Sequence, residues 1–349
     1  MILRAGRALP RLSSSYMHAS SNASARLPST LRSVHSKSLA QWIASLKEAK
    51  YEDTFHTERL SDLFATLSTR DGTRKPYEAP QAGEPLPHGH HLTFFYPRSA
   101  EANLRPDGTD GSFCPPPPFV RRMWAGGSMS WDNAHPLRVG DSASAVAVVD
   151  EDGVQLKGIS VDDLKKTQDR ESQDSKGDAP VSKSSMIFVN QHIAYTGAGQ
   201  KAPSVVERRS HVFLPGAAPR GGAPRPVDNL PVPEFSLEYL PTATTLFRFS
   251  ALTFNAHQIH LDKEYANHEG YEERLVHGPL TALMLLETMA YNFPAARPSY
   301  FEYRARNPLV VGRACTINGA WHDKRTALLW CVNEDGVVGM TGTVVVEEQ

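Results

Sequence analysis

One apolar run in the second half of the chain limits the possible folds more than any other feature. Residues 278–292 begin with Gly278-Pro279 and continue with Leu, Ala, Met and Thr, so apolar side chains occupy every face of the expected helix. A helix of this kind must be buried, which requires other elements on all its sides. Strand-like runs follow it at residues 300–306, 313–322, 326–332 and 337–346. We therefore expect a sheet that wraps around one buried helix.

The first half of the chain has similar strand-like runs but no comparable helix. Strands are expected at residues 91–96, 122–131, 142–150, 186–195 and 205–213. Where a helix would be needed, residues 106–118 form a loop that ends in four prolines. Residues 39–67 have helical spacing and predict a helical lead-in, whereas residues 244–250 predict a strand that opens the second half.

A short repeat indicates that the two halves are related. The sequences PLRVG at residues 136–140 and PLVVG at residues 308–312 each precede an expected strand, which favours a duplicated unit. Chance is an alternative, because Pro and Gly are common in turns. We expect a lead-in and first unit at residues 39–214, a Pro- and Gly-rich linker at 215–233, and a second unit at 234–349. Residues 158–178 are polar and predict an exposed insert.

Composition excludes several classes of function. The 349 residues are 40% apolar and 21% charged, with a formal net charge of −1, so a nucleic-acid partner is not expected. Because the sequence contains no run of about 18 apolar residues, a membrane span is not expected either. The three cysteines lack the spacing of a metal site.

The first 38 residues differ from the rest of the chain. Their basic residues alternate with Ser, Ala and Leu, and the first acidic residue of the chain is Glu48. This pattern is typical of a mitochondrial transit peptide, which predicts a location in the mitochondrial matrix. A basic tail without a targeting role is the alternative.

Polar residues just before the apolar helix are the candidates for chemistry. Asn255, His257 and His260 form a cluster in which His260 can act as a general acid or base near neutral pH. Asn255 can hold a water or a hydroxyl but cannot titrate. Gly278 starts the helix, so its free N–H and the helix dipole form a donor site for negative charge. Such a pair suits proton transfer beside a thioester carbonyl, whereas purely structural hydrogen bonding is the alternative for each residue alone.

Other site chemistries receive less support. His257, His260, His268 and His277 could supply zinc ligands, but no Cys lies nearby and no HExxH motif occurs. The chain also lacks a GxSxG nucleophile motif and a Gly-rich nucleotide loop. We expect neither a metal nor another cofactor.

These motifs resemble the MaoC-like hot-dog hydratases and dehydratases of acyl thioesters. The resemblance runs through Asn255-Ala-His257-Gln-Ile-His260 to Ala266, then through Val276-His277-Gly278, and includes the stretch from Arg121 to Gly127. Two groups are most similar: the fungal mitochondrial 3-hydroxyacyl-thioester dehydratases type 2 and the bacterial mesaconyl-C4-CoA hydratases. The resemblance covers about residues 85 to 349 and implies an α+β double hot-dog fold, with the central helix kept only in the C-terminal, catalytic unit.

The resemblance also implies roles for individual residues. His260 falls on the family's catalytic His and Gly278 on its oxyanion-hole glycine, with His257 and His277 in supporting positions. Asn255 falls where the family has a catalytic Asp. Because Asn255 cannot titrate, two alternatives remain. Either His260 transfers all protons while Asn255 orients the leaving water, or His257 takes part in the proton transfer.

Three functions remain open at this stage. The first is the dehydratase step of mitochondrial fatty acid synthesis, on CoA or carrier-protein thioesters, with Arg121 and Arg122 near the carrier's phosphates. The second is hydration of a short dicarboxylic acyl-CoA, with Arg248 or Arg274 at the acyl end. The third is an inactive thioester-binding protein, because the Asp is missing. A homodimer is compatible with all three. In each, the first unit without its helix would leave an apolar groove for an acyl chain, unless residues 39–67 fill it.

Overall fold

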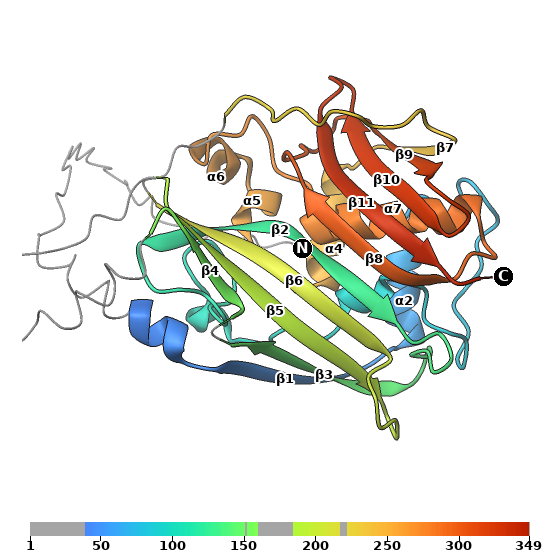
Figure 1. Ribbon diagram of the computed structural model, residues 1–349, viewed down its shortest axis with the longest axis horizontal. Coiled ribbons are helices and arrows are strands. Elements are labelled where there is room, and N and C mark those ends of the chain that lie inside the picture. Colours follow the sequence, from blue (N-terminus) through green and yellow to red (C-terminus); the bar gives the residue numbers. More distant parts are fainter. Residues whose placement is uncertain (1–38, 151, 160–183, 217–221, 349) are drawn as a thin grey trace, which may run out of the picture.

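The strands of both halves belong to one continuous sheet (Figure 1). The structure, a computed structural model, describes residues 39–150, 152–159, 184–216 and 222–348. The first half contributes β1 (Lys47–Thr54), β2 (Phe119–Trp131), β3 (Ser142–Val149), β4 (Val154–Lys157), β5 (Met186–Gly197) and β6 (Val205–Pro215). The second half contributes β7 (Phe235–Tyr239), β8 (Pro298–Ala305), β9 (Cys315–Trp321), β10 (Thr326–Asn333) and β11 (Val338–Val346).

The order of the strands is repeated in mirror fashion across the sheet. The first half runs β1-β3-β5-β6-β2 and the second continues β8-β11-β10-β9-β7, while β4 pairs only with β5. The halves join where β2 and β8 pair antiparallel, with Met129 opposite Phe301. Each half thus places its first strand at an outer edge and its second strand at the central junction. This is the expected α+β double hot-dog fold.

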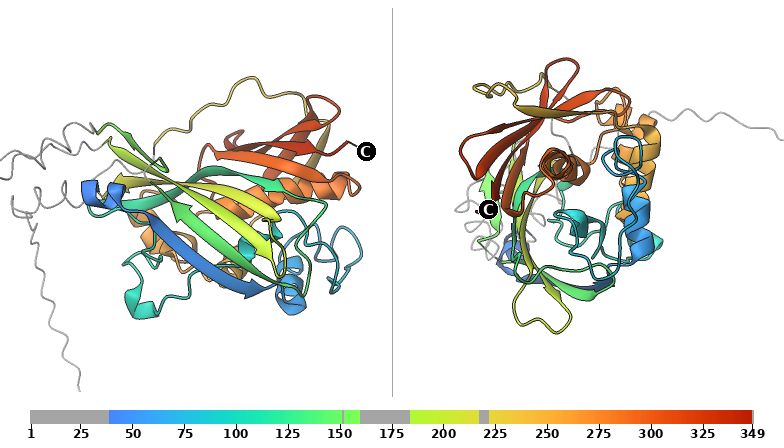
Figure 2. Two further views of the ribbon diagram at one scale, coloured as in Figure 1. Left: turned by 60° about the horizontal axis from the view of Figure 1, so that its bottom comes forward. Right: turned by 90° about the vertical axis from the view of Figure 1, so that its right-hand side faces the viewer.

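Among the described residues, only those of the second half form a long helix in the hollow of their sheet. Helix α7 (Gly278–Asn292) begins after the extended residue His277, with Pro279 in its first turn, where the missing N–H costs no hydrogen bond. Ten of its residues are buried, as the all-apolar sequence predicts. The end-on view in Figure 2 shows the helix enclosed by the second half of the sheet.

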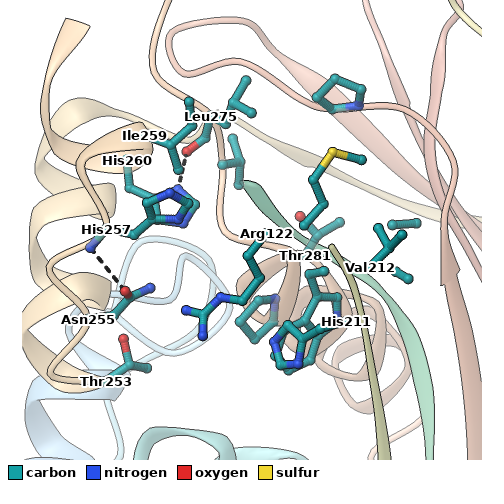
Figure 3. A pocket seen from close by; sticks show the side chains of 18 of the residues that line it. Arg122, His211, Val212, Thr253, Asn255, His257, Ile259, His260, Leu275 and Thr281 are labelled. Carbon is teal, nitrogen blue, oxygen red and sulfur yellow. Dashed lines mark hydrogen bonds between the residues drawn. The ribbon is translucent and has the colours of Figure 1, made fainter. Parts of the chain in front are cut away.

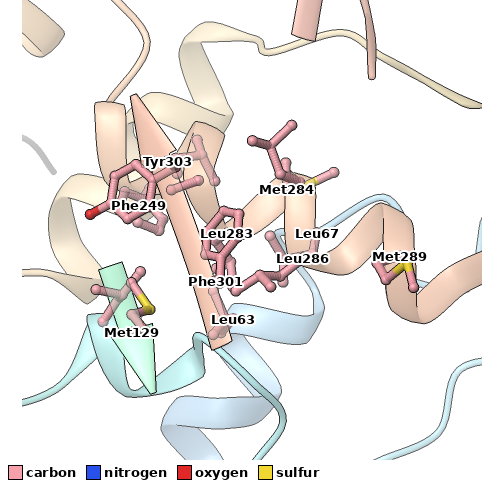
Figure 4. Packing of buried hydrophobic residues seen from close by; sticks show 14 of the residues in the cluster. Leu63, Leu67, Met129, Phe249, Leu283, Met284, Leu286, Met289, Phe301 and Tyr303 are labelled. Atoms are coloured by element: carbon pink, nitrogen blue, oxygen red, sulfur yellow. The ribbon is translucent and has the colours of Figure 1, made fainter. Parts of the chain in front are cut away.

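Helix α2 (Thr57–Phe64) completes the core from the first half of the chain. Its apolar face buries Leu60, Leu63 and Phe64, and Leu67 follows directly after it. Leu63 and Leu67 belong to the same apolar cluster as Leu283 and Leu286 of α7 (Figure 4). The lead-in region therefore contributes to the same apolar core as the long helix.

The repeated PLxVG sequence forms the same turn in both halves. Leu137 and Leu309 are buried, and the two glycines, Gly140 and Gly312, adopt φ values of 88° and 81°, which glycine tolerates best. In the second half this turn holds the segment just before α7, because Val276 N–H donates to Leu309 O over 2.8 Å. The duplication inferred from the repeat is thus matched by backbone conformation as well as by strand order.

The predicted helical lead-in is wrong over its middle. Residues 39–44 are helical, but the next element is the strand β1, whose sequence KEAKYEDT has good helix formers. Pairing with β3 decides the outcome, because side chains alternate between a half-buried and a solvent-facing position along this edge strand.

Two predicted strands are also helical in the structure. Residues 91–96 contain the short 3₁₀ helix η1 (His90–Thr93), and residues 244–250 lie in α4 (Ala243–Leu252). Thr242 and Thr245 form a capping box at the start of α4, so threonines that favour a strand by composition start a helix here. Strand β7 was not predicted, although its buried residues Phe235, Leu237 and Tyr239 alternate as in a strand.

Three shorter helices and several boundaries complete the description. The helices are η2 (Glu101–Asn103), α5 (Gln258–Leu261) and α6 (Lys263–His268).

The expected transit peptide lies outside the described residues, as does most of the expected insert at 158–178. The expected linker separates β6 from β7, and its described residues from 222 onward form neither helix nor strand. No helix within the described ranges has the length and apolar character needed to cross a membrane.

Candidate functional site

A cavity of about 1490 Å³ lies between the first half of the sheet and the polar segment before α7. Its walls include Ala145, Ala147 and Ile193 from the first sheet, and Asn255, His257, His260 and Gly278 from the second half. Figure 3 shows side chains from both halves turned toward the same space. The groove expected in the first half is therefore filled only in part by α2 and η1, and its remainder opens onto the cluster of histidines.

His260 has one ring nitrogen fixed and the other available. The residue lies on α5, and its Nδ1 is 2.8 Å from the carbonyl oxygen of Leu275 (Figure 3). A carbonyl can only accept, so Nδ1 carries the proton and Nε2 keeps its lone pair. Burial lowers the pKa of His260 to about 4, an effect opposed by the bond to Leu275 and reinforced by the charge of Arg122. At neutral pH the ring is thus an uncharged base.

The start of α7 lies directly against this base. The rings of His260 and His277 stack with centroids 3.7 Å apart, and His277 immediately precedes Gly278. Nε2 of His277 is 2.9 Å from Ser250 Oγ, and burial lowers the pKa of His277 well below its usual value. A Cβ at position 278 would lie 2.8 Å from the Trp124 ring, so only glycine fits there. The first-turn N–H groups of α7 have no acceptor within the helix.

Asn255 has a defined orientation. Its Oδ1 accepts a hydrogen bond of 3.1 Å from the backbone N–H of His257 (Figure 3). The side-chain NH₂ is therefore the end that can donate to a ligand in the cavity. The preceding residue, Phe254, has φ 48°, and this left-handed conformation turns the chain from α4 toward α5.

The predicted loop at residues 106–118 supports this segment, a role that was not predicted. Asp107 accepts hydrogen bonds from the N–H and hydroxyl of Thr109, and its Oδ2 lies 4.0 Å from His257 Nε2. Its backbone oxygen accepts from Gln258 N–H over 3.0 Å. Gly108 packs so closely that a Cβ there would lie 2.1 Å from Ala256 O. The proline-rich loop thus supplies a carboxylate beside His257, and only its Asp-Gly turn would have signalled this.

A buried ion pair holds Trp124 over the helix start. Arg209 is 2.7 Å from the fully buried Glu207, and its guanidinium lies 5.2 Å from the Trp124 ring. The pairing keeps the pKa of Glu207 far below its usual range, although burial alone would raise it. Tyr195 donates to the same carboxylate over 2.7 Å. Tyr195 comes from β5, and Glu207 and Arg209 come from β6. The alternating pattern that predicted these strands did not indicate a charged cluster.

The four predicted substrate-binding arginines have different positions. Arg122 lines the cavity, and so does Arg121, which forms a 2.6 Å ion pair with Glu269. Arg248 is exposed on α4 and donates to the carbonyl oxygen of Ala65, while Arg274 pairs with the adjacent Glu273. Neither Arg248 nor Arg274 lines the cavity. Among the four, Arg122 is the one that faces the catalytic candidates.

The model of the hydroxyacyl-thioester dehydratase type 2 family matches residues 89–311. The chain belongs to this family.

The relatives of the chain carry out related reactions. The chain is 34% identical to mesaconyl-C(4)-CoA hydratase of Chloroflexus aurantiacus over 278 residues, which cover 78% of this chain and 86% of the relative. It is 27% identical to the mitochondrial hydroxyacyl-thioester dehydratase type 2 of Schizosaccharomyces pombe over 252 residues, 68% of this chain and 80% of the relative. Among solved structures, a MaoC-like dehydratase from Phytophthora capsici matches with a TM-score of 0.60 and 15% identity, covering 89% of this chain and 99% of the other.

Membership of the hydroxyacyl-thioester dehydratase type 2 family confirms the expected resemblance, the double hot-dog fold and the enzyme class. The protein is a hydro-lyase that acts on thioesters. Within the part of the chain that the structure describes, no group of three His, Cys, Asp or Glu residues is arranged to hold a metal ion.

Proposed function

We propose that this protein interconverts 3-hydroxyacyl thioesters and 2-enoyl thioesters plus water at the cavity formed by His260, Asn255 and Gly278. One observation carries the proposal: the imidazole with a free Nε2 stacks on the residue that precedes the start of the buried helix. A base and a set of unpaired N–H donors therefore lie next to each other, as proton abstraction beside a carbonyl requires.

The reaction follows from these positions. The thioester oxygen accepts a hydrogen bond from Gly278 N–H, so negative charge that develops on this oxygen is stabilised by the donor and the helix dipole. Nε2 of His260 removes a proton from the α-carbon. The bond between the β-carbon and its hydroxyl breaks, and the hydroxyl takes the proton from His260 and leaves as water. One proton moves through one imidazole, so no second carboxylate is required.

Asn255 acts on the departing oxygen. Because its Oδ1 is occupied by His257 N–H, its NH₂ group can donate to the hydroxyl without competing for the proton. His257 offers the alternative route for the proton, since its ring centroid lies 5.4 Å from that of His260 and its Nε2 faces Asp107. Burial and the neighbouring His260 lower the pKa of His257 well below its usual value, which favours the route through His260.

Two classes of acyl chain fit different parts of the cavity. The apolar wall formed by Ala145, Ala147 and Ile193 supports a fatty acyl chain, and with the basic N-terminal region it supports the dehydratase step of mitochondrial fatty acid synthesis in the matrix. Arg122 supports the second class, a short dicarboxylic acyl-CoA. The substrate's carrier is CoA or an acyl carrier protein, and a homodimer is compatible with either.

Hydration of crotonyl-CoA tests the proposal. We expect the absorbance of the enoyl thioester to fall when enzyme is added, and the wild-type rate to exceed that of His260→Ala by orders of magnitude. The same measurement on carrier-protein-bound crotonyl separates the two carriers. A protein that binds the thioesters tightly but leaves their absorbance unchanged, with every acyl chain tried, would be the inactive binder instead.

A further inference from the structure

Arg122 places a positive charge inside the cavity, where Asp107 and Asp110 attract it without forming an ion pair with it. It lies on β2 and projects into the space between Asn255 and His211 (Figure 3). Among the described residues, no hydrogen-bond acceptor or carboxylate pairs with its guanidinium. Its neighbour Arg121, in contrast, forms the ion pair with Glu269. The two adjacent arginines therefore have separate roles.

The acidic residues nearest to Arg122 are already engaged. Asp107 accepts two hydrogen bonds from Thr109 and lies 3.7 Å from Arg105. Asp110 accepts from Ser112 N–H at 2.7 Å and from the Ser99 hydroxyl at 2.5 Å. These contacts hold both carboxylates within their own loop, so they leave the guanidinium of Arg122 directed at the cavity.

An enclosed guanidinium without a partner is unfavourable unless a ligand supplies the negative charge. The cavity walls lower the pKa of Arg122, yet a guanidinium stays protonated in proteins, so it cannot avoid the cost by losing its proton. Its planar set of donors suits the two oxygens of a carboxylate or of a phosphate. Arg122 is thus placed to bind an anion that enters with the substrate.

The position of Arg122 distinguishes these two anions. Figure 3 shows its side chain between Asn255 and His211, and its charge also acts on His257 and His260, so it lies close to the proposed reacting centre. The phosphates of CoA or of a carrier protein stand at the far end of the pantetheine arm from the thioester carbonyl. A carboxylate on the acyl chain, one or two bonds from the β-carbon, would instead reach the same region as Asn255.

We propose that Arg122 binds a carboxylate at the acyl end of the substrate, and that the enzyme therefore selects short dicarboxylic acyl thioesters over alkyl ones. The inference rests on the proposed function, whose site it extends. The sequence predicted Arg122 near the carrier's phosphates and Arg248 or Arg274 at the acyl end. Under this proposal Arg122 binds the acyl end in place of Arg248 and Arg274.

A matched pair of substrates tests the selection. Crotonyl-CoA and fumaryl-CoA share the enoyl thioester and differ by a methyl against a carboxylate at the same carbon. We expect wild-type kcat/KM to favour fumaryl-CoA by roughly 100-fold or more, as for a site built around a buried charge pair. Arg122→Met should lower this preference by about the same factor, and Arg122→Lys should keep part of it because it retains the charge. Arg208→Met, an exposed arginine on β6, is the control and should leave the preference unchanged.

The outcomes separate this inference from the proposed function. If wild type hydrates both thioesters equally and Arg122→Met leaves their ratio unchanged, the inference is wrong while the proposed function stands. If neither the two short thioesters nor longer enoyl thioesters are hydrated, the proposed function itself fails. The same comparison is made with N-acetylcysteamine thioesters, which carry no phosphate. If Arg122→Met lowers the preference for fumaryl with CoA thioesters but not with these, Arg122 contacts the phosphates and the proposal is wrong.

Discussion

The imidazoles of His260 and His277 stack with their ring centroids 3.7 Å apart and their planes 22° apart. Two charged rings would repel each other at this distance, so the contact favours the neutral form of both. It also joins the segment after α4 to the residue that precedes α7. Because His277 directly precedes Gly278, this contact holds the proposed base, His260, close to the proposed oxyanion donor.

Substitution of His260 tests the proposed base. We expect His260→Ala to lower kcat by about 10²- to 10⁴-fold, because proton transfer by a positioned side chain contributes about that much. His260→Gln, which can still donate to Leu275 O, should be equally impaired. The rates are measured with crotonyl-CoA, and circular dichroism checks that both variants fold. His322→Ala, at an exposed histidine in the turn between β9 and β10, serves as the control. If His260→Gln turns over crotonyl-CoA about as fast as wild type, His260 is not the catalytic base.

A carboxylate at position 255 should change the pH dependence of the enzyme. Asn255→Asp keeps an acceptor for His257 N–H but places a negative charge near His260, which raises the pKa of that imidazole. In wild type, kcat/KM should fall only as the pH approaches about 4, where His260 becomes protonated. In the variant this acidic limb should move to higher pH, and kcat should drop because the NH₂ donor is lost. Identical pH profiles would show that position 255 does not face the base.

Gly108 should affect activity although we assign it no contact with the substrate. Gly108→Ala adds a Cβ 2.1 Å from Ala256 O, which forces the segment carrying Asn255 and His257 to move. We expect a loss of activity of at least tenfold. Gly83→Ala is the matched control, because Gly83 has a similar positive φ of 87° and its Cβ would meet nothing within 4 Å. Both variants should lose about 1 kcal/mol of stability from backbone strain, measured by urea unfolding. Equal activity in the two would contradict the role of this loop.

The protein should lose stability in mild acid. The folded-state pKa of His260, about 4, lies below the ordinary value of 6.5, so the unfolded chain binds more protons between these two pH values. Stability present above pH 6.5 is therefore lost as the pH falls toward 4. From pH 7 to pH 5 this one residue accounts for about 2 kcal/mol. Urea unfolding at both pH values should show a smaller decrease for His260→Gln than for wild type.

The sequence predicted those elements whose own residues determine them. The buried helix at Gly278 follows from apolar residues on all its faces, and the repeated PLxVG turns follow from glycines that must take positive φ. Two other elements were misjudged, one because it depends on a pairing partner and one because its local cap was overlooked. The strand β1 has good helix formers and is extended only because β3 pairs with it, whereas α4 is helical because of a capping box between two threonines.

The catalytic candidates were all predicted on the C-terminal side of the site, whereas Arg121 and Arg122 were the residues predicted from the first half. Asn255, His257, His260 and Gly278 lie within 24 residues, so their spacing could be read directly. Asp107 and Trp124 reach the same place from the first half through the fold, and no local pattern connects them to His257 or Gly278. The roles of Arg248 and Arg274 could not be judged either, because their directions depend on contacts with Ala65 and Glu273.

The pairing of β2 with β8 has a consequence for how the enzyme works at low concentration. Both walls of the cavity and all the proposed catalytic groups come from one polypeptide, so the site does not have to be assembled from separate subunits. Dilution should leave the specific activity constant for as long as the chain stays folded, whether or not copies associate.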